Sequence, residues 1–210
     1  MNGQTNDTLN VLFQEIGSHL RASDDIREGI ANTFFTMVLG AITGLVILRL
    51  NGQALSSSTV RISILLGSGL IAFGEVVLWG VIAIRKWHAE YVNSMILVQA
   101  MITNKSFTPV AEIVPKELRY SYAPGLSTSR TYLLVQIGIA CLFFGVADIV
   151  GEIIGDLCLS YFITLILSAL IFFLNRYTAK KALSSAEKKF WDNPASSWCF
   201  AGFMIKKTVN

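Results

Sequence analysis

The chain has 210 residues, of which 53% are hydrophobic and 15% are charged, and its mean hydropathy is +0.55. This composition is too apolar for an ordinary soluble domain of such length, and the apolar residues gather in four blocks. The net charge of +3 is unremarkable in total, so no direct binding of nucleic acid is expected.

Residues that carry metal, redox or catalytic chemistry are few and scattered. The three cysteines form no Cys-x-x-Cys pair, and there are two histidines, so neither metal binding nor thiol redox chemistry is expected. Nucleophile-elbow, phosphate-loop and His-Glu-x-x-His patterns are absent from the sequence. The sequence therefore predicts a protein that is not an enzyme and that holds no cofactor or metal. The cysteines are Cys141, Cys158 and Cys199, and the histidines are His19 and His88.

Residues 1–29 are polar and partly acidic, and they lack the pattern of a cleavable signal, so we expect a cytosolic N-terminal segment. Thr8 to Leu20 is typical of an amphipathic helix. Two interpretations are open: a helix lying on the membrane or on its own protein, or a helix that binds a partner. Ser23-Asp24-Asp25 predicts the capped start of a second helix. The apolar positions of the first helix are Leu9, Leu12, Phe13, Ile16 and Leu20.

Residues 30–84 predict the first transmembrane hairpin, with spans at about 30–50 and 60–84 joined by the polar turn 51–59. Gly40 and Gly44 lie four residues apart on one face with Thr33 and Thr36, a spacing that lets membrane helices approach closely. Packing within the chain and dimerisation are both compatible with this face.

The stretch from Val60 to Thr103 is expected to form one helix that crosses the membrane and continues into the cytosol. At about 1.5 Å per residue it is roughly 66 Å long, whereas a bilayer core is about 30 Å thick. Arg85 and Lys86 end its apolar part, but neither glycine nor proline follows before Thr103. An apolar stripe continues at helical spacing with Trp87, Tyr91, Met95, Val98 and Ile102.

Residues 85–130 are predicted to be a cytosolic helix and loop. The loop holds three of the four prolines, which argues against another span, and its own apolar residues are expected to order it against the preceding helix. These apolar residues are Val110, Ile113, Val114 and Leu118.

Residues 131–174 predict the second transmembrane hairpin, with a tight turn at Gly155-Asp156. A stripe of small and acidic residues runs along its first span, and a ridge of small polar residues runs along its second span. We expect Gly138 and Gly145 of the stripe to pack against a neighbouring helix. The stripe consists of Gly138, Cys141, Gly145, Asp148 and Glu152, and the ridge of Ser160, Thr164 and Ser168.

Residues 175–210 predict a basic cytosolic tail, in which the segment 198–205 is apolar but too short to span. Because lysine and arginine concentrate in 85–130 and in this tail, the positive-inside rule places both termini in the cytoplasm. We expect contacts with anionic head groups or with a cytosolic partner at Arg85, Lys86, Trp87, Tyr91, Lys180, Lys181, Lys188 and Lys189.

The intramembrane acids are Glu75, Asp148 and Glu152, and a carboxylate at the bilayer centre costs about 2.5–3.5 kcal/mol on insertion scales. No basic residue occupies the middle of a span. For Glu75 two interpretations stay open: an ion or proton path, or a protonated carboxyl that donates a hydrogen bond within the bundle, for example to Thr43 or Ser168. For Asp148 the structural interpretation is favoured.

The predicted architecture is an all-α polytopic membrane protein with four transmembrane helices and cytosolic helical extensions. This plan resembles the small four-span membrane subunits of bacterial anti-phage systems, such as the membrane component of Kiwa. The resemblance covers the layout of the chain, and no residue role is carried over from it. It implies a bacterial inner-membrane location and a soluble protein partner.

Two functions from different classes follow. The first is a non-catalytic, homo-oligomeric membrane subunit that works with a cytosolic partner as a channel-like or membrane-perturbing effector, or as a membrane sensor. The second is a small proton-coupled transporter that uses Glu75.

Overall fold

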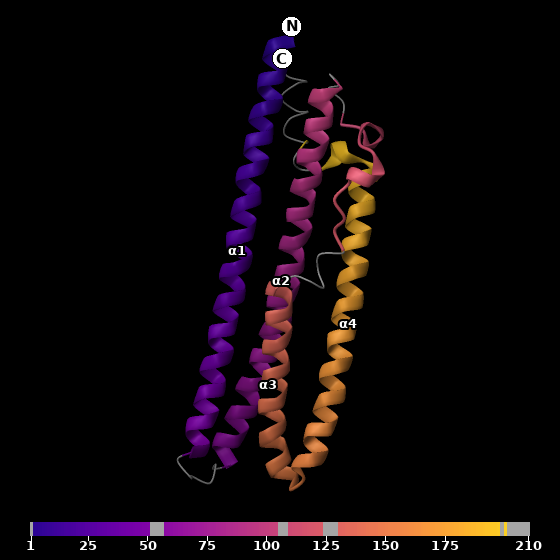
Figure 1. The fold of residues 1–210 in the computed structure, drawn as a ribbon. Helices are drawn as coiled ribbons and strands as arrows, with labels where there is room; N and C mark the ends of the chain where they lie inside the picture. Colours follow the sequence, from indigo (N-terminus) through magenta and orange to yellow (C-terminus); the bar gives the residue numbers. More distant parts are fainter. Residues whose placement is uncertain (1, 51–56, 105–108, 124–129, 198–199, 201–210) are drawn as a thin grey trace. The chain divides into compact units, whose positions relative to one another are not determined.

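The computed structural model describes residues 2–50, 57–104, 109–123, 130–197 and 200, with side chains at 7, 9–44, 46, 47 and, within those ranges, from 60 onward. This part of the chain is helical and holds no strand, which confirms the all-α prediction. Figure 1 shows its four α-helices, which are α1 (Asn2–Leu50), α2 (Ser57–Thr103), α3 (Arg130–Ile154) and α4 (Leu157–Asp192). Short 3-10 helices lie at Ala111–Ile113, Lys116–Leu118 and Pro194–Ser196.

The chain divides into two compact units. Unit 1 comprises Met1–Ile26, Ala83–Leu126 and Lys180–Asn210, and unit 2 comprises Arg27–Ile82 and Ser127–Ala179. The helices α1, α2 and α4 each contribute residues to both units.

The unbroken helix predicted for 60–103 is confirmed, since α2 runs from Ser57 to Thr103. The predicted helix start at Ser23-Asp24-Asp25 is wrong, because α1 continues through it to Leu50 and the Ser23 hydroxyl donates back to the Leu20 carbonyl oxygen at 2.7 Å. A serine is tolerated inside a helix, at a small cost, when its hydroxyl bonds to a carbonyl oxygen of the preceding turn in this way.

The helix that contains the predicted fourth span extends into the predicted tail. The helix α4 continues past Leu174 to Asp192, because it contains no proline that would interrupt it. The basic residues at 180–189 are therefore helical. The turn at 51–56, Cys199 and most of the apolar segment 198–205 lie outside the described residues.

Unit 2 is organised around Phe34 of α1, which is 1% exposed. A Cβ at Gly74 of α2 would lie 2.8 Å from Phe34 Cζ, and a Cβ at Gly138 of α3 would lie 2.9 Å from Phe34 Cε1. The absence of a side chain at both glycines therefore makes room for the ring, and three helices meet there.

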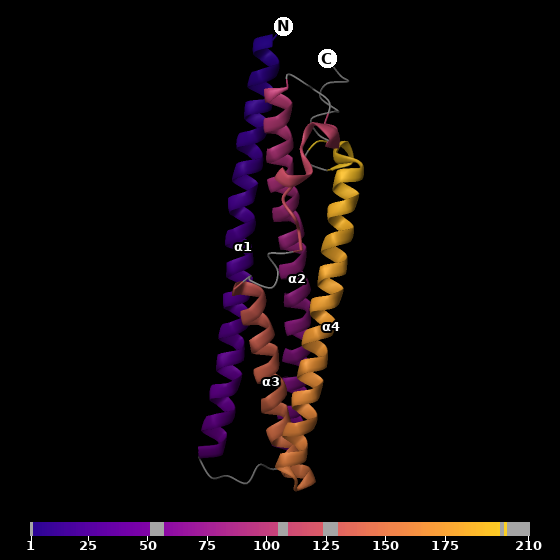
Figure 2. The ribbon, with the colours of Figure 1, turned by 45° about the vertical axis from the view of Figure 1, so that its right-hand side comes forward.

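The turn between α3 and α4 follows the prediction for Gly155-Asp156, and Figure 2 shows these two helices as neighbours joined by it. Gly155 has φ +77°, a left-handed conformation that glycine adopts without steric cost. Asp156 Oδ1 accepts a hydrogen bond at 2.9 Å from the Leu159 N–H and caps α4. Ser160 and Thr164 of the predicted polar ridge are buried, and the Ser160 hydroxyl donates to the Ala147 carbonyl oxygen at 2.6 Å.

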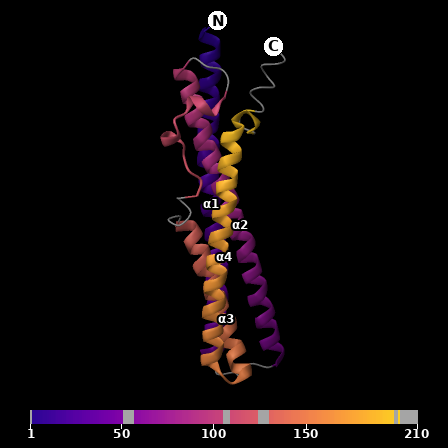
Figure 3. The ribbon, with the colours of Figure 1, turned by 90° about the vertical axis from the view of Figure 1, so that its right-hand side faces the viewer.

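Unit 1 buries the apolar side of the N-terminal part of α1, as one interpretation of that segment required. Leu9, Leu12 and Ile16 are buried within the protein. Figure 3 shows the segment after α2 returning alongside that helix. Val114 of this segment is buried, whereas Leu118 is 62% exposed, so the expectation that Leu118 packs inward is wrong.

Three described helical segments are long and apolar enough to cross a membrane: Val60–Thr103, Arg130–Ile154 and Leu157–Asp192. The predicted first span, 30–50, is not among them, and its side chains at 45 and 48–50 lie outside the described part. The structure is therefore consistent with an integral membrane protein.

Candidate functional site

Glu75 in unit 2 has an amide partner rather than a basic one. The Asn175 side-chain nitrogen donates to both Glu75 carboxyl oxygens, each at 2.9 Å, and Asn175 is only 8% exposed. The sequence interpretation named Thr43 or Ser168 as partners, and this is wrong. Asn175 was assigned to the tail, but the uninterrupted α4 carries it into unit 2.

The geometry at Glu75 is that of an acceptor. One NH₂ group reaches both oxygens, so the carboxyl group accepts hydrogen bonds from Asn175. The structural interpretation had assumed that the carboxyl group donates one. A hydrogen bond of this kind offsets part of the cost of holding an acid among apolar helices.

The other two predicted acids do not join Glu75. Asp148 accepts a hydrogen bond from the Tyr161 hydroxyl at 2.6 Å, which favours a structural role within the α3–α4 hairpin. Glu152 is exposed near the end of α3. Among the described residues, no group of three or more histidine, cysteine or acidic residues is placed to hold a metal ion.

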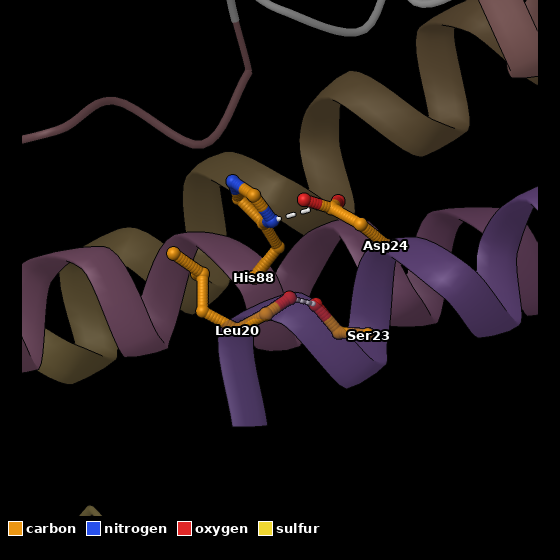
Figure 4. Close-up of polar contacts among 4 residues, drawn as sticks. All are labelled: Leu20, Ser23, Asp24 and His88. Carbon is orange, nitrogen blue, oxygen red and sulfur yellow. Dashed lines mark hydrogen bonds and ion pairs between the residues drawn. The ribbon is translucent and has the colours of Figure 1, made fainter. Parts of the chain in front are cut away.

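Unit 1 contains a contact between α1 and α2 that the sequence did not indicate. His88 Nδ1 lies 3.2 Å from Asp24 Oδ1, and Figure 4 shows the two side chains facing each other from their helices. Nearby on the same helices, the His19 and Tyr91 rings stack at 5.7 Å between centroids. These contacts join the N-terminal part of α1 to the C-terminal half of α2.

Of the residues at 85–91 that were predicted to contact lipid or a partner, two are buried and two are exposed. Arg85 is 9% exposed, with its guanidinium 5.2 Å from the centre of the Tyr120 ring, and Tyr91 is 8% exposed. Both therefore pack inside unit 1. Lys86 and Trp87 are exposed, so they are the members of this set that remain available to head groups or a partner. Trp87, at 50% exposed, is not on the buried stripe.

The segment 109–123 is bound to α2 through Asn93. This side chain accepts from the Tyr120 N–H at 2.7 Å and donates to the Tyr120 carbonyl oxygen at 2.8 Å. Asn93 is fully buried, and an asparagine among the mostly apolar buried residues of α2 is the sequence signal that could have revealed its role.

The same segment is bound to α4 through Glu187 and Arg119. One Glu187 oxygen accepts from the Ser121 hydroxyl and from the Tyr122 N–H, each at 3.0 Å. The Arg119 guanidinium lies 4.5 Å from the centre of the Trp191 ring, a favourable cation–π distance. The helix α4 also presents Lys180, Lys181, Lys188 and Lys189 to its surroundings, where all four are exposed.

The four glycines predicted to pack helices behave differently from one another. Gly138 contacts Phe34, whereas a Cβ at Gly40 or Gly44 would meet nothing within 4 Å. Packing of Gly40 and Gly44 against described residues of this chain is therefore not observed. Gly44 and Gly145 line an apolar cavity in unit 2.

Comparison with known proteins identifies no relative. No protein-family model, curated protein or solved structure matches the chain significantly.

Proposed function

We propose that the chain is a non-catalytic, homo-oligomeric subunit of the bacterial inner membrane that crosses the bilayer four times and presents unit 1 to a soluble partner in the cytoplasm. The contact that carries this proposal is the one between Asp24 and His88. It supports four crossings by a parity argument.

Segments of one folded unit lie in one compartment, and unit 1 contains both Asp24 and His88. The chain between them therefore crosses the membrane an even number of times. Since the apolar part of α2 accounts for one crossing, residues 27–50 of α1 supply the second. The packing of Phe34 between Gly74 and Gly138, which belong to two candidate spans, supports the same conclusion.

The chemistry of unit 1 is consistent with a docking and membrane-contact role. Its surface carries Lys180, Lys181, Lys188 and Lys189, and each basic residue near an anionic bilayer contributes about 1 kcal/mol of attraction. The unbroken α2 links the apolar stretch to unit 1, as a membrane sensor or a channel-like effector requires. A place among the membrane subunits of anti-phage defence is proposed from the resemblance of the sequence layout alone.

The face of α1 that carries Gly40 and Gly44 supports self-association, because a Cβ at either glycine would meet nothing within 4 Å. Gly40→Leu is expected to shift the assembled protein to smaller species in mild detergent, because a branched side chain blocks close helix approach. The measurement is mass by light scattering after size-exclusion chromatography. Gly69→Leu is the matched control, since a Cβ at Gly69 also meets nothing within 4 Å. Unchanged mass in Gly40→Leu means that this face contacts lipid.

A proton-coupled transporter is the second candidate, favoured by the placement of Glu75 and Asn175 within the apolar helices. Glu75→Gln keeps a hydrogen bond to Asn175 and removes the titratable group. Proton flux into proteoliposomes is the measurement. Proton flux that is present in the natural protein and abolished in Glu75→Gln would identify a transporter. Absence of flux in both proteins, together with stoichiometric co-isolation of a soluble protein, would support the membrane subunit.

A further inference from the structure

Unit 2 contains a cavity of about 320 Å³ between α1, α2 and α3. Its walls are almost entirely apolar, with one hydroxyl, at Ser63, and one thiol, at Cys141. Small residues make the space, because Ala41, Gly44 and Gly145 line it where larger side chains would fill it. The rest of the lining is Ile42, Leu66, Gly67, Leu70, Leu142, Val146 and Ile149.

The cavity opens onto the apolar outside of the helices. Leu66 lines it and is 62% exposed, and the adjacent Leu65 is 73% exposed. Cys141 also lines the cavity and is exposed. Since these residues belong to candidate membrane spans, the mouth of the cavity is continuous with the surface that contacts lipid.

The size and chemistry of this space select its occupant. An apolar cavity of ~150 Å³ stays dry and takes up benzene, so one about twice as large favours a longer hydrocarbon over water. Because residues of candidate membrane spans form the mouth, the hydrocarbon that reaches it is an acyl chain of the bilayer. We propose that the cavity binds one acyl chain of a bilayer phospholipid.

Two glycines of one helix face provide a matched pair of variants. A Cβ meets nothing within 4 Å at either Gly40 or Gly44, but only Gly44 lines the cavity. Gly44→Leu fills the cavity from the α1 side. Gly40→Leu carries the same change one turn away and controls for effects on helix association.

The first experiment counts phospholipids on the full chain by native mass spectrometry after purification in detergent. The natural protein and Gly40→Leu are expected to retain about one phospholipid per chain under conditions that strip the remaining lipid. Gly44→Leu is expected to lose it. Equal retention by Gly44→Leu and Gly40→Leu, or no retained phospholipid in the natural protein, would overturn the proposal.

The second experiment uses the natural protein and does not depend on how a variant folds. Cys141 lines the cavity, while Cys158 is exposed elsewhere in unit 2 and serves as an internal reference. Added phospholipid is expected to slow alkylation of Cys141 by N-ethylmaleimide in detergent and to leave the rate at Cys158 unchanged. An alkylation rate of Cys141 that does not change with added phospholipid would refute the proposal. A rate that falls only as the protein concentration rises would also refute it and would identify a second copy as the occupant.

Discussion

Phe34→Ala is expected to lower the free energy of unfolding by about 3–5 kcal/mol, the cost of removing a buried phenylalanine. The ring fills the space that Gly74 and Gly138 leave open, so its removal leaves a gap between α1 and both of these helices. The measurement is reversible unfolding in detergent, followed by circular dichroism.

Phe162→Ala is the matched control. It removes the same ring from α4 of the same unit, at a position that is 61% exposed, so its effect is expected to be small. Equal destabilisation by the two variants would show that Phe34 does not pack between the helices and would remove one of the two observations that place α1 in the membrane bundle.

Asn175→Leu is expected to destabilise the protein by about 1–3 kcal/mol or more, because it leaves the Glu75 carboxyl without its amide donor. For a protein of this size that corresponds to roughly 2–12 °C in the unfolding midpoint. Ser168→Ala is the control on the same helix, since the buried Ser168 hydroxyl has no described hydrogen-bond partner.

The double variant Glu75→Leu/Asn175→Leu distinguishes loss of the hydrogen bond from poor fit of leucine at 175. Replacing both polar partners by apolar groups removes the unsatisfied acid, so the double variant is expected to be more stable than Asn175→Leu alone. If the two single effects simply add, the pair is not coupled and Glu75 has another partner.

Local signals account for what could be predicted from the sequence. The α3–α4 turn was predictable because Gly155 and Asp156 supply a left-handed residue and a cap within two adjacent positions. The full length of α2 was predictable because Lys86 to Thr103 contains nothing that breaks a helix.

The errors arise where a distant contact overrides a local signal. Glu75 and Asn175 are 100 residues apart, so nothing near Glu75 indicated its partner. Ser23-Asp24 has the composition of a helix cap, yet Asp24 instead faces His88 of another helix. Arg85 was expected to contact head groups or a cytosolic partner, but its guanidinium lies over the Tyr120 ring, and the residue is buried in unit 1.

The central claim is that four crossings place all three segments of unit 1 on the cytoplasmic side. Topology reporters fused separately before Met1, between Asn104 and Lys105, and after Asn210 test it most directly in bacterial cells. Alkaline phosphatase is active only outside the cytoplasm, and green fluorescent protein is fluorescent only inside it. The account predicts fluorescence and no phosphatase activity at all three positions. Phosphatase activity at the N-terminal fusion alone would indicate three crossings and would contradict the parity argument from Asp24 and His88.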